Sequence, residues 1–343
     1  MSWQSPLHLR LDGEALVSNW RWLAKQSGAA ACGAAVKADG YGIGAREVVA
    51  RLAKAGCRDF YVATWGEAEA LGALPEGVAL SVLHGVRAED MEVAVGSVAR
   101  PTLNTVEQVK RWQSTGLPCD VMIDTGMNRL GLSVRDVIDG ALDGLNIDTL
   151  MSHLASADED CDLNAKQQAT FSALGNRTKV KRLSLANSAG ICLGADYAFD
   201  LTRPGLALYG GIPRAEAVGH IAQVAFPEAQ ILQRRTVLAG DTVGYNATFL
   251  AHQDMEVAIL NLGYADGYLR GFSGTGSAGG GRLPVIGRVS MDLIAVSVDE
   301  EPTLAEGDWV SIDYQLPVAS AASGLSQYEL LTGLGSRYTR QWS

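Results

Sequence analysis

Short apolar runs alternate with amphipathic stretches rich in Ala, Leu, Glu and Lys from residue 11 to about residue 210. An apolar run followed by a turn and a helix-like stretch is typical of a βα unit. Eight runs are predicted to be strands: 31–36, 58–63, 78–83, 98–103, 118–123, 147–153, 181–185 and 198–202. A (β/α)8 barrel is the economical closure of eight such units, because each crossover must be short and right-handed. A doubly wound sheet is the alternative.

Helices are predicted between these strands from their apolar spacing and their end signals. The clearest are 45–56, which Gly56 ends, 104–115, which Asn104 caps, and 163–174. Helices in these positions would cover the outside of a barrel.

The pattern of apolar and polar residues changes after Gly210, where the apolar runs are separated by predicted turns and not by predicted helices. Five further strands are predicted: 229–238, 255–262, 283–289, 293–298 and 308–312. The glycine-rich segment 273–281 is predicted to be a flexible surface loop. We therefore expect a barrel domain over 1–212 and a mostly β domain over 213–343, and the extreme N-terminal strand could belong to either.

Composition excludes several classes of protein. The 343 residues are 47% hydrophobic, which suffices for a full core, and 28 Lys+Arg against 38 Asp+Glu give a net charge of −10. This balance argues against nucleic acid and anionic membranes as partners. The five cysteines lack the spacing of a disulfide framework or a zinc site, and no signal peptide or membrane span is apparent, so we expect no metal and a cytoplasmic location.

The carboxyl ends of barrel strands are where catalytic groups gather. Lys37 follows the first strand directly, and Tyr41 lies one turn later. A desolvated lysine there could serve as a Schiff-base amine, because burial lowers its pKa from about 10.4 toward 7–8. The alternative is a lysine that simply reaches solvent from a strand end.

Other strand ends carry complementary groups. The fifth is followed by Asp124 and Arg129, which could bind an anion or form a purely structural pair, and the sixth by His153. The loops after the seventh and eighth strands, with Ser188 and Arg203, match the usual phosphate position of barrels. A lysine, a phosphate-binding site and arginines that face one cavity are the groups that would bind pyridoxal 5'-phosphate.

The sequence resembles the alanine racemase family, whose members are pyridoxal-phosphate enzymes with an N-terminal barrel and a C-terminal β domain. The resemblance covers nearly the whole chain. It rests on eight motifs in the family's order: AAVKADGYGIGA at 34–45, DTGMNRLGL at 124–132, SHLASADE at 152–159, LANSAG at 185–190, RPGLALYGG at 203–211, VGYNATF at 243–249, LGYADGYLR at 262–270 and GRVSMD at 287–292. Any one motif would be weak, but eight in order are specific.

The resemblance implies an isomerase that interconverts L- and D-alanine. Lys37 would carry the cofactor aldehyde as an aldimine and move the α-proton on one face of the substrate, and Tyr245 would do so on the other. In this family that tyrosine enters the site from the partner subunit, which implies a head-to-tail homodimer with shared active sites. Two bases are needed because a proton must reach either face of a planar carbanion.

The resemblance also assigns supporting residues. Arg203 would approach the pyridine nitrogen and keep it unprotonated, since a guanidinium does not give up its proton, and His153 would link Tyr245 to Arg203. The remaining assignments are Tyr41, Asn187, Ser188, Gly205 and Leu206 for the phosphate, Arg129 and Met291 for the substrate carboxylate, and Asp158, Tyr264 and Asp292 for the access corridor.

Four positions depart from the family pattern. Met122 stands where many members have a carbamylated lysine that supports the arginine, and Ser184 stands where a histidine is common. Asn128 replaces a common glycine, and Tyr338 is out of register with the family's phosphate-binding tyrosine. Racemases of serine, lysine or broad specificity share this architecture and stay open as alternatives, whereas an amino-acid decarboxylase would be expected to place an acid at the ring nitrogen.

Overall fold

The computed structural model describes residues 5–175 and 178–343, and the chain divides into two compact units. The barrel unit comprises Leu16–Leu208 and Ile212–Ala222. The β-rich unit comprises the described part of Met1–Ala15 together with Tyr209–Gly211 and Gln223–Ser343. Among the described residues, no helix is both long enough and apolar enough to cross a bilayer.

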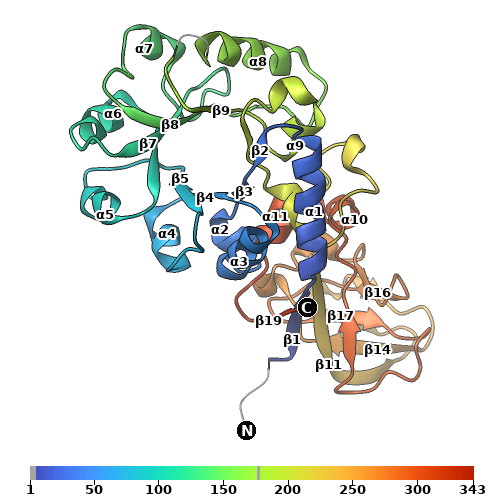
Figure 1. Cartoon of the computed structure of the whole chain (residues 1–343). Coiled ribbons are helices and arrows are strands. Elements are labelled where there is room, and N and C mark those ends of the chain that lie inside the picture. Colours follow the sequence, from blue (N-terminus) through green and yellow to red (C-terminus); the bar gives the residue numbers. More distant parts are fainter. Residues whose placement is uncertain (1–4, 176–177) are drawn as a thin grey trace. The chain divides into compact units, whose positions relative to one another are not determined.

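The strands of a curled seven-stranded parallel sheet (Figure 1) and of a two-stranded parallel sheet together form the ring of the barrel unit. In chain order they are β2 (Ala31–Cys32), β3 (Ala34–Ala35), β4 (Asp59–Val62), β5 (Ala79–Val82), β6 (Arg100–Leu103), β7 (Pro118–Met122), β8 (Asn146–Met151), β9 (Arg182–Ser184) and β10 (Leu201–Thr202). Gly33 interrupts the first strand, so β2 pairs with β10 while β3 pairs with β4. The amide of Arg203, next to β10, donates to the carbonyl of Ala186, next to β9, at 2.8 Å and completes the ring. The predicted barrel is confirmed, and all eight predicted strands are present.

Helices alternate with these strands. They are α1 (Gly13–Gln26), α2 (Lys37–Tyr41), α3 (Ala45–Ala55), α4 (Trp65–Leu71), α5 (Met91–Gly96), α6 (Val106–Gln113), α7 (Val134–Ile138), α8 (Asp162–Gly175) and α9 (Ser188–Cys192), with 3-10 turns at Ala195–Tyr197, Leu206–Tyr209 and Ala215–Ala217. Helix α3 ends at Gly56, whose φ of 119° suits glycine.

The predicted Asn104 cap is wrong. Thr105 caps α6 by accepting from the amide of Gln108, whereas the Asn104 side chain is buried and donates to the carbonyls of Leu83 and Thr102. The side-chain amide of Asn104 is thus held against the end of β6 and the loop after β5, and not against the first turn of α6.

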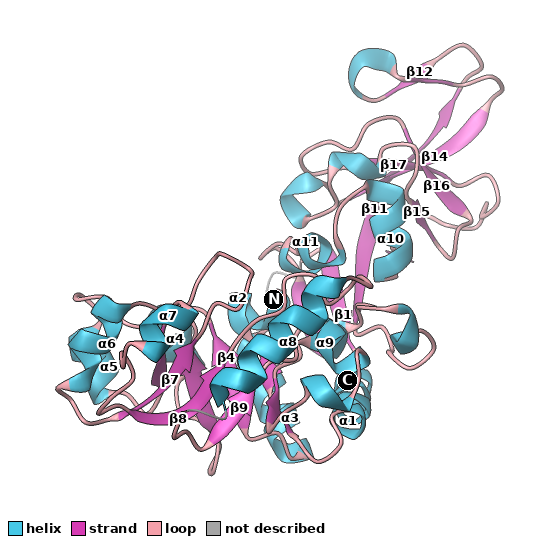
Figure 2. Cartoon of the chain, turned by 90° about the horizontal axis from the view of Figure 1, so that it is seen from above, coloured by secondary structure: helices cyan, strands magenta, loops and turns pink. Residues whose placement is uncertain are grey.

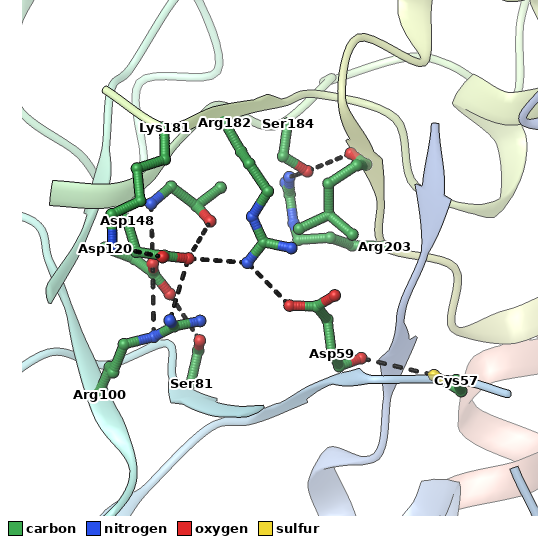
Figure 3. Close-up of polar contacts among 12 residues, drawn as sticks. Cys57, Asp59, Ser81, Arg100, Asp120, Asp148, Lys181, Arg182, Ser184 and Arg203 are labelled. Atoms are coloured by element: carbon green, nitrogen blue, oxygen red, sulfur yellow. Dashed lines mark hydrogen bonds and ion pairs between the residues drawn. The ribbon is translucent and has the colours of Figure 1, made fainter. Parts of the chain in front are cut away.

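An ion-pair network occupies the end of the barrel where the strands begin (Figure 3). Arg182 Nη2 on β9 bonds Asp59 Oδ1 on β4 at 2.8 Å and Asp148 Oδ2 on β8 at 2.7 Å, and Arg100 Nη1 on β6 bonds Asp148 Oδ2 at 3.0 Å. Asp120 on β7 is fully buried and accepts from Ser81 Oγ at 2.5 Å. These contacts join strands far apart around the ring, so they hold the barrel's cross-section fixed beneath the opposite end.

The β-rich unit is built on one sheet (Figure 2). Its order is β15 (Ser277–Ala278), β16 (Leu283–Ile286), β17 (Ile294–Ser297), β14 (Met255–Leu260), β11 (Ala225–Val237), β1 (Leu7–Leu11) and β19 (Thr339–Trp342), with β18 (Trp309–Ser311) also paired to β11. The hairpin β12 (Thr242–Val243) and β13 (Phe249–Leu250), the helices α10 (Leu316–Ser323) and α11 (Gln327–Thr332), and 3-10 turns at Tyr245–Ala247, Tyr264–Asp266 and Arg270–Phe272 complete it.

The prediction of a flexible loop over 273–281 is wrong. This segment contains β15, and Ala278 is fully buried. Asp313 accepts hydrogen bonds from Ser277 Oγ and from the amides of Gly280 and Gly281. The glycines therefore fold around a carboxylate from a distant part of the chain, which offsets the entropy of ordering them.

Candidate active site

Lys37 follows β3 and Val36 directly and is half-buried at the barrel mouth. Burial lowers the pKa of its amine, and the nearby guanidinium of Arg129 lowers that pKa further, whereas the carboxylate of Glu67 raises it. The amine is therefore easier to deprotonate than that of an exposed lysine. This environment favours a chemical role over the alternative of a lysine that merely reaches solvent.

Arg129 lies in the loop after β7, which Asp124 organises. One oxygen of Asp124 accepts from the amides of Gly126 and Met127 at 2.8 and 2.9 Å, and the other accepts from the amide of Arg129 at 3.0 Å. Asp124 thus binds the backbone of Arg129, whose guanidinium acts on Lys37 through its charge. The carboxylate therefore holds the backbone of this loop in place.

Asn128 and Met122 fit this loop. Asn128 has a φ of 57°, a left-handed conformation that asparagine tolerates better than most residues, which explains why it can replace a glycine. Met122 is buried, and its side chain lies where a Cβ on Gly131 would approach within 3.1 Å. The side chain at 122 therefore packs beneath the loop.

Arg203 is buried at the end of β10, where its guanidinium is held on two sides. Its Nη1 donates to Ser184 Oγ (Figure 3). Its Nη2 donates to the carbonyl of Ser152 at 2.6 Å, and Ser184 Oγ in turn donates to the carbonyl of Leu201 at 2.5 Å. Ser184 therefore orients Arg203 where a histidine is common. Ser184 and Ser152 use two of the five guanidinium donors, so the link from Arg203 to His153 that the resemblance implies stays a prediction.

His153 lies close to Arg203, Arg129 and Lys37. Burial, then the charges of Arg203, Arg129 and Lys37, lower its pKa to about 3, so its imidazole is neutral at pH 7. A neutral imidazole can accept a hydrogen bond as well as donate one. Lys37, Arg129, His153 and Arg203, which come from four different strand ends, thus form one electrostatic cluster.

A second group of predicted residues lies together at the ends of β9 and β10. Asn187 caps α9 by accepting from the amide of Gly190 at 2.9 Å, and Ser188 Oγ accepts from the amides of Gly205 and Ala207 at 2.9 and 3.2 Å. The Gly205 amide is therefore engaged with Ser188. A Cβ at Gly205 would overlap the hydroxyl of Tyr41, so these side chains are in close contact with the backbone before Leu206.

Four predicted residues lie in the β-rich unit. Tyr245 is 67% exposed and lines a cavity of about 700 Å³ together with Val243, Ile286, Arg288 and Leu293. Met291 is also exposed, and its carbonyl accepts from the amide of Ala265 beside the half-buried Tyr264. Asp292 pairs with Arg337 at 2.7 Å. In the barrel unit, the predicted corridor residue Asp158 is exposed, and Tyr338 of the β-rich unit is buried.

Two residues near the cluster were not predicted. Gln167 on α8 is fully buried, where it donates to the carbonyl of His153 at 3.0 Å and accepts from the amide of Ala155 at 2.9 Å. Glu67 on α4 accepts from the amide next to Lys37. Only Glu67 has a sequence signal, because Thr64 and Glu67 have the spacing of a capping box.

The fold and the site define an enzyme of the barrel class, with a lysine of lowered pKa beside two arginines at the barrel mouth, and with a β-rich unit in the same chain. Two family models match the chain: "Alanine racemase, N-terminal domain" over residues 11–213 and "Alanine racemase, C-terminal domain" over residues 224–342. The chain therefore belongs to the alanine racemase family.

Individual relatives cover almost the whole chain. It is 38% identical to an alanine racemase of Acidiphilium cryptum, over 97% of each chain, and 40% identical to one of Methylobacterium nodulans, over 97% of this chain and 95% of the relative. Among solved structures, the alanine racemase of Bartonella henselae with covalently bound pyridoxal phosphate superposes with a TM-score of 0.92 at 34% identity, over 99% of this chain and 100% of that one.

Proposed function

We propose that this protein interconverts L- and D-alanine, with pyridoxal 5'-phosphate held at the barrel mouth by Lys37. The observation that carries the proposal is a half-buried lysine at a strand end that lies close to Arg129 and His153, where burial and the charge of Arg129 also lower its pKa. Membership of the family and the cofactor of the Bartonella henselae enzyme support the choice of substrate and cofactor.

The residues around Ser188 fit a phosphate. Because the Ser188 hydroxyl accepts two amide hydrogen bonds, both of its lone pairs are used and its proton is left to donate to an anion. The hydroxyl of Tyr41 lies against Gly205, where a side chain would fill the space it occupies. Ser188, Tyr41, Asn187 and the backbone at Gly205 and Leu206 would hold the phosphate group.

Pyridoxal phosphate, when bound, supplies an aldehyde for amine condensation and a ring that withdraws electrons from the substrate's α-carbon. Lys37 would bind that aldehyde and carry the α-proton on one face of the substrate. Arg203 would donate to the ring nitrogen, and its orientation by Ser184 and Ser152 fixes a charge that does not leave as a proton. Arg129, whose backbone Asp124 holds, would bind the substrate carboxylate together with the amide of Met291.

Tyr245 would carry the proton on the opposite face, from a partner subunit. A tyrosine that is 67% exposed beside a cavity of its own unit is available to another copy of the chain. The functional form is then a head-to-tail homodimer in which the 213–343 domain supplies Tyr245 to the partner's barrel, where His153 would meet it. Tyr264, Asp292 and Asp158 would line the path to the site. We further propose a cytoplasmic location, which the five free cysteines support.

Mixing two inactive variants tests the shared site. Lys37→Ala and Tyr245→Phe should each abolish α-deuteration of L-alanine in deuterated water, and mixing the two should restore part of the turnover. The mixture forms one intact site per heterodimer only if the lysine and tyrosine come from different chains. No recovery on mixing, with dimers verified, would mean that each site is built within one chain. Assaying L-serine and L-lysine alongside would reveal a different substrate.

A further inference from the structure

The backbone after Lys37 has an unusual conformation. Ala38, Asp39 and Tyr41 have φ of 52°, 51° and 54°, and the glycines Gly40 and Gly42 among them have φ of 64° and 89°. For residues other than glycine this left-handed region costs roughly 1–2 kcal/mol each. Three strained residues in a row of five persist only where surrounding contacts hold them.

Glu67 makes one of those contacts. Its Oε1 accepts from the amide of Ala38 at 2.8 Å, so it binds the first residue of the left-handed turn. Its Oε2 accepts from the amide of Ala63 at 2.6 Å, directly after β4. One carboxylate therefore ties the turn that carries Lys37 to the neighbouring strand of the barrel.

Helix α4 places that carboxylate. Thr64 caps the helix, and its side chain accepts from the amide of Glu67 at 3.2 Å while Glu67 reaches back to the amide of Thr64 at 3.3 Å. The reciprocal cap fixes the Glu67 side chain before it meets Ala38. The contact with the turn is thus built into the start of a helix and does not depend on a freely moving side chain.

The same carboxylate is the opposing charge in a cationic cluster. Arg129, from the loop after β7, acts on Lys37 in the same direction as burial, and Glu67 acts against both. His153, from the loop after β8, also faces Lys37, but it is neutral at pH 7 because its pKa is lowered to about 3. Asp39 lies in the turn itself, and its carboxylate accepts from the amide of Ala45 at 2.8 Å.

We propose that Glu67 is the positioning residue of Lys37, which holds the left-handed turn in the shape that directs the lysine to the cofactor. This role rests on the proposed function, in which Lys37 condenses with an aldehyde. A protonated amine has no lone pair for that attack. The charge of Glu67 therefore matters as well as its hydrogen bond, and the two effects can be separated.

Two substitutions separate them. Glu67→Gln removes the charge and keeps one acceptor oxygen, whereas Glu67→Ala removes the charge and both acceptors. Both variants should lower the pH at which Lys37 loses its proton, because the charge that opposes Arg129 is gone. Glu67→Ala should also loosen the turn and weaken pyridoxal phosphate binding by roughly tenfold, the effect of one charge-assisted hydrogen bond. Glu67→Gln should weaken it less, because its one oxygen can still accept from the amide of Ala38, although not from that of Ala63 as well. Glu69→Gln, at an exposed position of the same helix, is the matched control.

Competitive labelling of the cofactor-free full-length protein with acetic anhydride measures the first effect. Peptide mass spectrometry compares the labelling of Lys37 with that of the exposed Lys54 across a pH series. The Lys37 midpoint should move to lower pH in both Glu67 variants and stay unchanged in Glu69→Gln. An unchanged midpoint, or one that moves to higher pH, would overturn the electrostatic part of the proposal.

Absorbance titration of the same proteins with pyridoxal phosphate measures the second effect. Wild-type affinity in a folded Glu67→Ala protein would overturn the positioning role, and if that variant does not fold, Glu67→Gln still gives the labelling result. Neither measurement needs turnover. A wild-type protein that does not racemise alanine would remove the proposed function while leaving the Lys37 midpoint readable.

Discussion

The tight space beside Gly205 predicts that Gly205→Ala impairs cofactor binding. A Cβ at this position would overlap the Tyr41 hydroxyl and lie 2.8 Å from its Cζ and 3.4 Å from its Cε2. Tyr41 is only 6% exposed, so its ring cannot swing away into solvent. Either the ring moves away from Gly205, or the backbone at residue 205 shifts and the hydrogen bond from its amide to Ser188 Oγ is broken.

The magnitude follows from these two outcomes. Forcing one extra methyl group into a packed site costs about 1–3 kcal/mol of folding stability. Losing one hydrogen bond to an anion costs about 1.5–3 kcal/mol, which corresponds to a roughly 10- to 100-fold weaker Kd for pyridoxal phosphate. Gly205→Ala should therefore show both a lower unfolding free energy and a weaker Kd.

Absorbance titration of the cofactor-free protein gives the Kd, and urea unfolding gives the stability. Gly96→Ala is the control, since this helical glycine has nothing within 4 Å of its added Cβ. Tyr41→Phe removes the hydroxyl that the Cβ meets first, so the cost of Gly205→Ala should be smaller in that background. A Gly205→Ala protein with the wild-type Kd and stability would refute the reasoning.

Two further substitutions test the supports of the site. Ser184→Ala removes the acceptor of Arg203 Nη1 in a fully buried position. The value of kcat/KM should fall about tenfold or more, which is the effect of losing a hydrogen bond to a charged group. Unchanged kinetics would show that the carbonyl of Ser152 alone is enough to orient Arg203. Burial opposes ionisation of Asp148, yet its hydrogen bond to Arg182 and the charge of Arg100 hold its pKa below the ordinary value. Its stabilising contribution is therefore present above the ordinary aspartate pKa and is lost as pH falls through the lowered one. Asp148→Asn should be less stable than wild type at pH 7 in urea unfolding, with a difference that shrinks toward acid pH, and a difference that does not change with pH would contradict the assignment.

Most of the barrel could be predicted because its strands are largely buried and contain short apolar runs. The strand at 59–62 is an example, since Phe60, Tyr61 and Val62 are buried one after another. What the pattern did not reveal depends on contacts between distant segments. The segment 273–281 is ordered by hydrogen bonds to Asp313, which lies far away in the sequence. Thr105 caps α6 because the side chain of Asn104 is buried in the barrel unit instead.

The candidate site shows the same division. Lys37, His153 and Arg203 stand directly at strand ends, so a barrel topology is enough to bring them together. Glu67 and Gln167 act through backbone atoms of loops from other strands, and their partners are known only once those loops are placed. The capping box of Thr64 and Glu67 predicts the start of a helix, but nothing in the sequence shows that Glu67 Oε1 accepts from the turn after Lys37.

The charge of the site is opposite to that of the chain. The protein carries −10 overall, yet Lys37, Arg129 and Arg203 gather at one barrel mouth. The adjacent carboxylates are engaged with backbone amides, Asp124 with its own loop and Glu67 with the lysine turn. Because like charges at a partly desolvated site repel, the cluster is less stable without an anion than with one. The same positive field would attract the carboxylate of an amino acid into a protein that is otherwise negative. Pyridoxal phosphate at 100 times its Kd should stabilise the fold by about 2.7 kcal/mol, because a ligand that binds only the folded state shifts the folding equilibrium toward it.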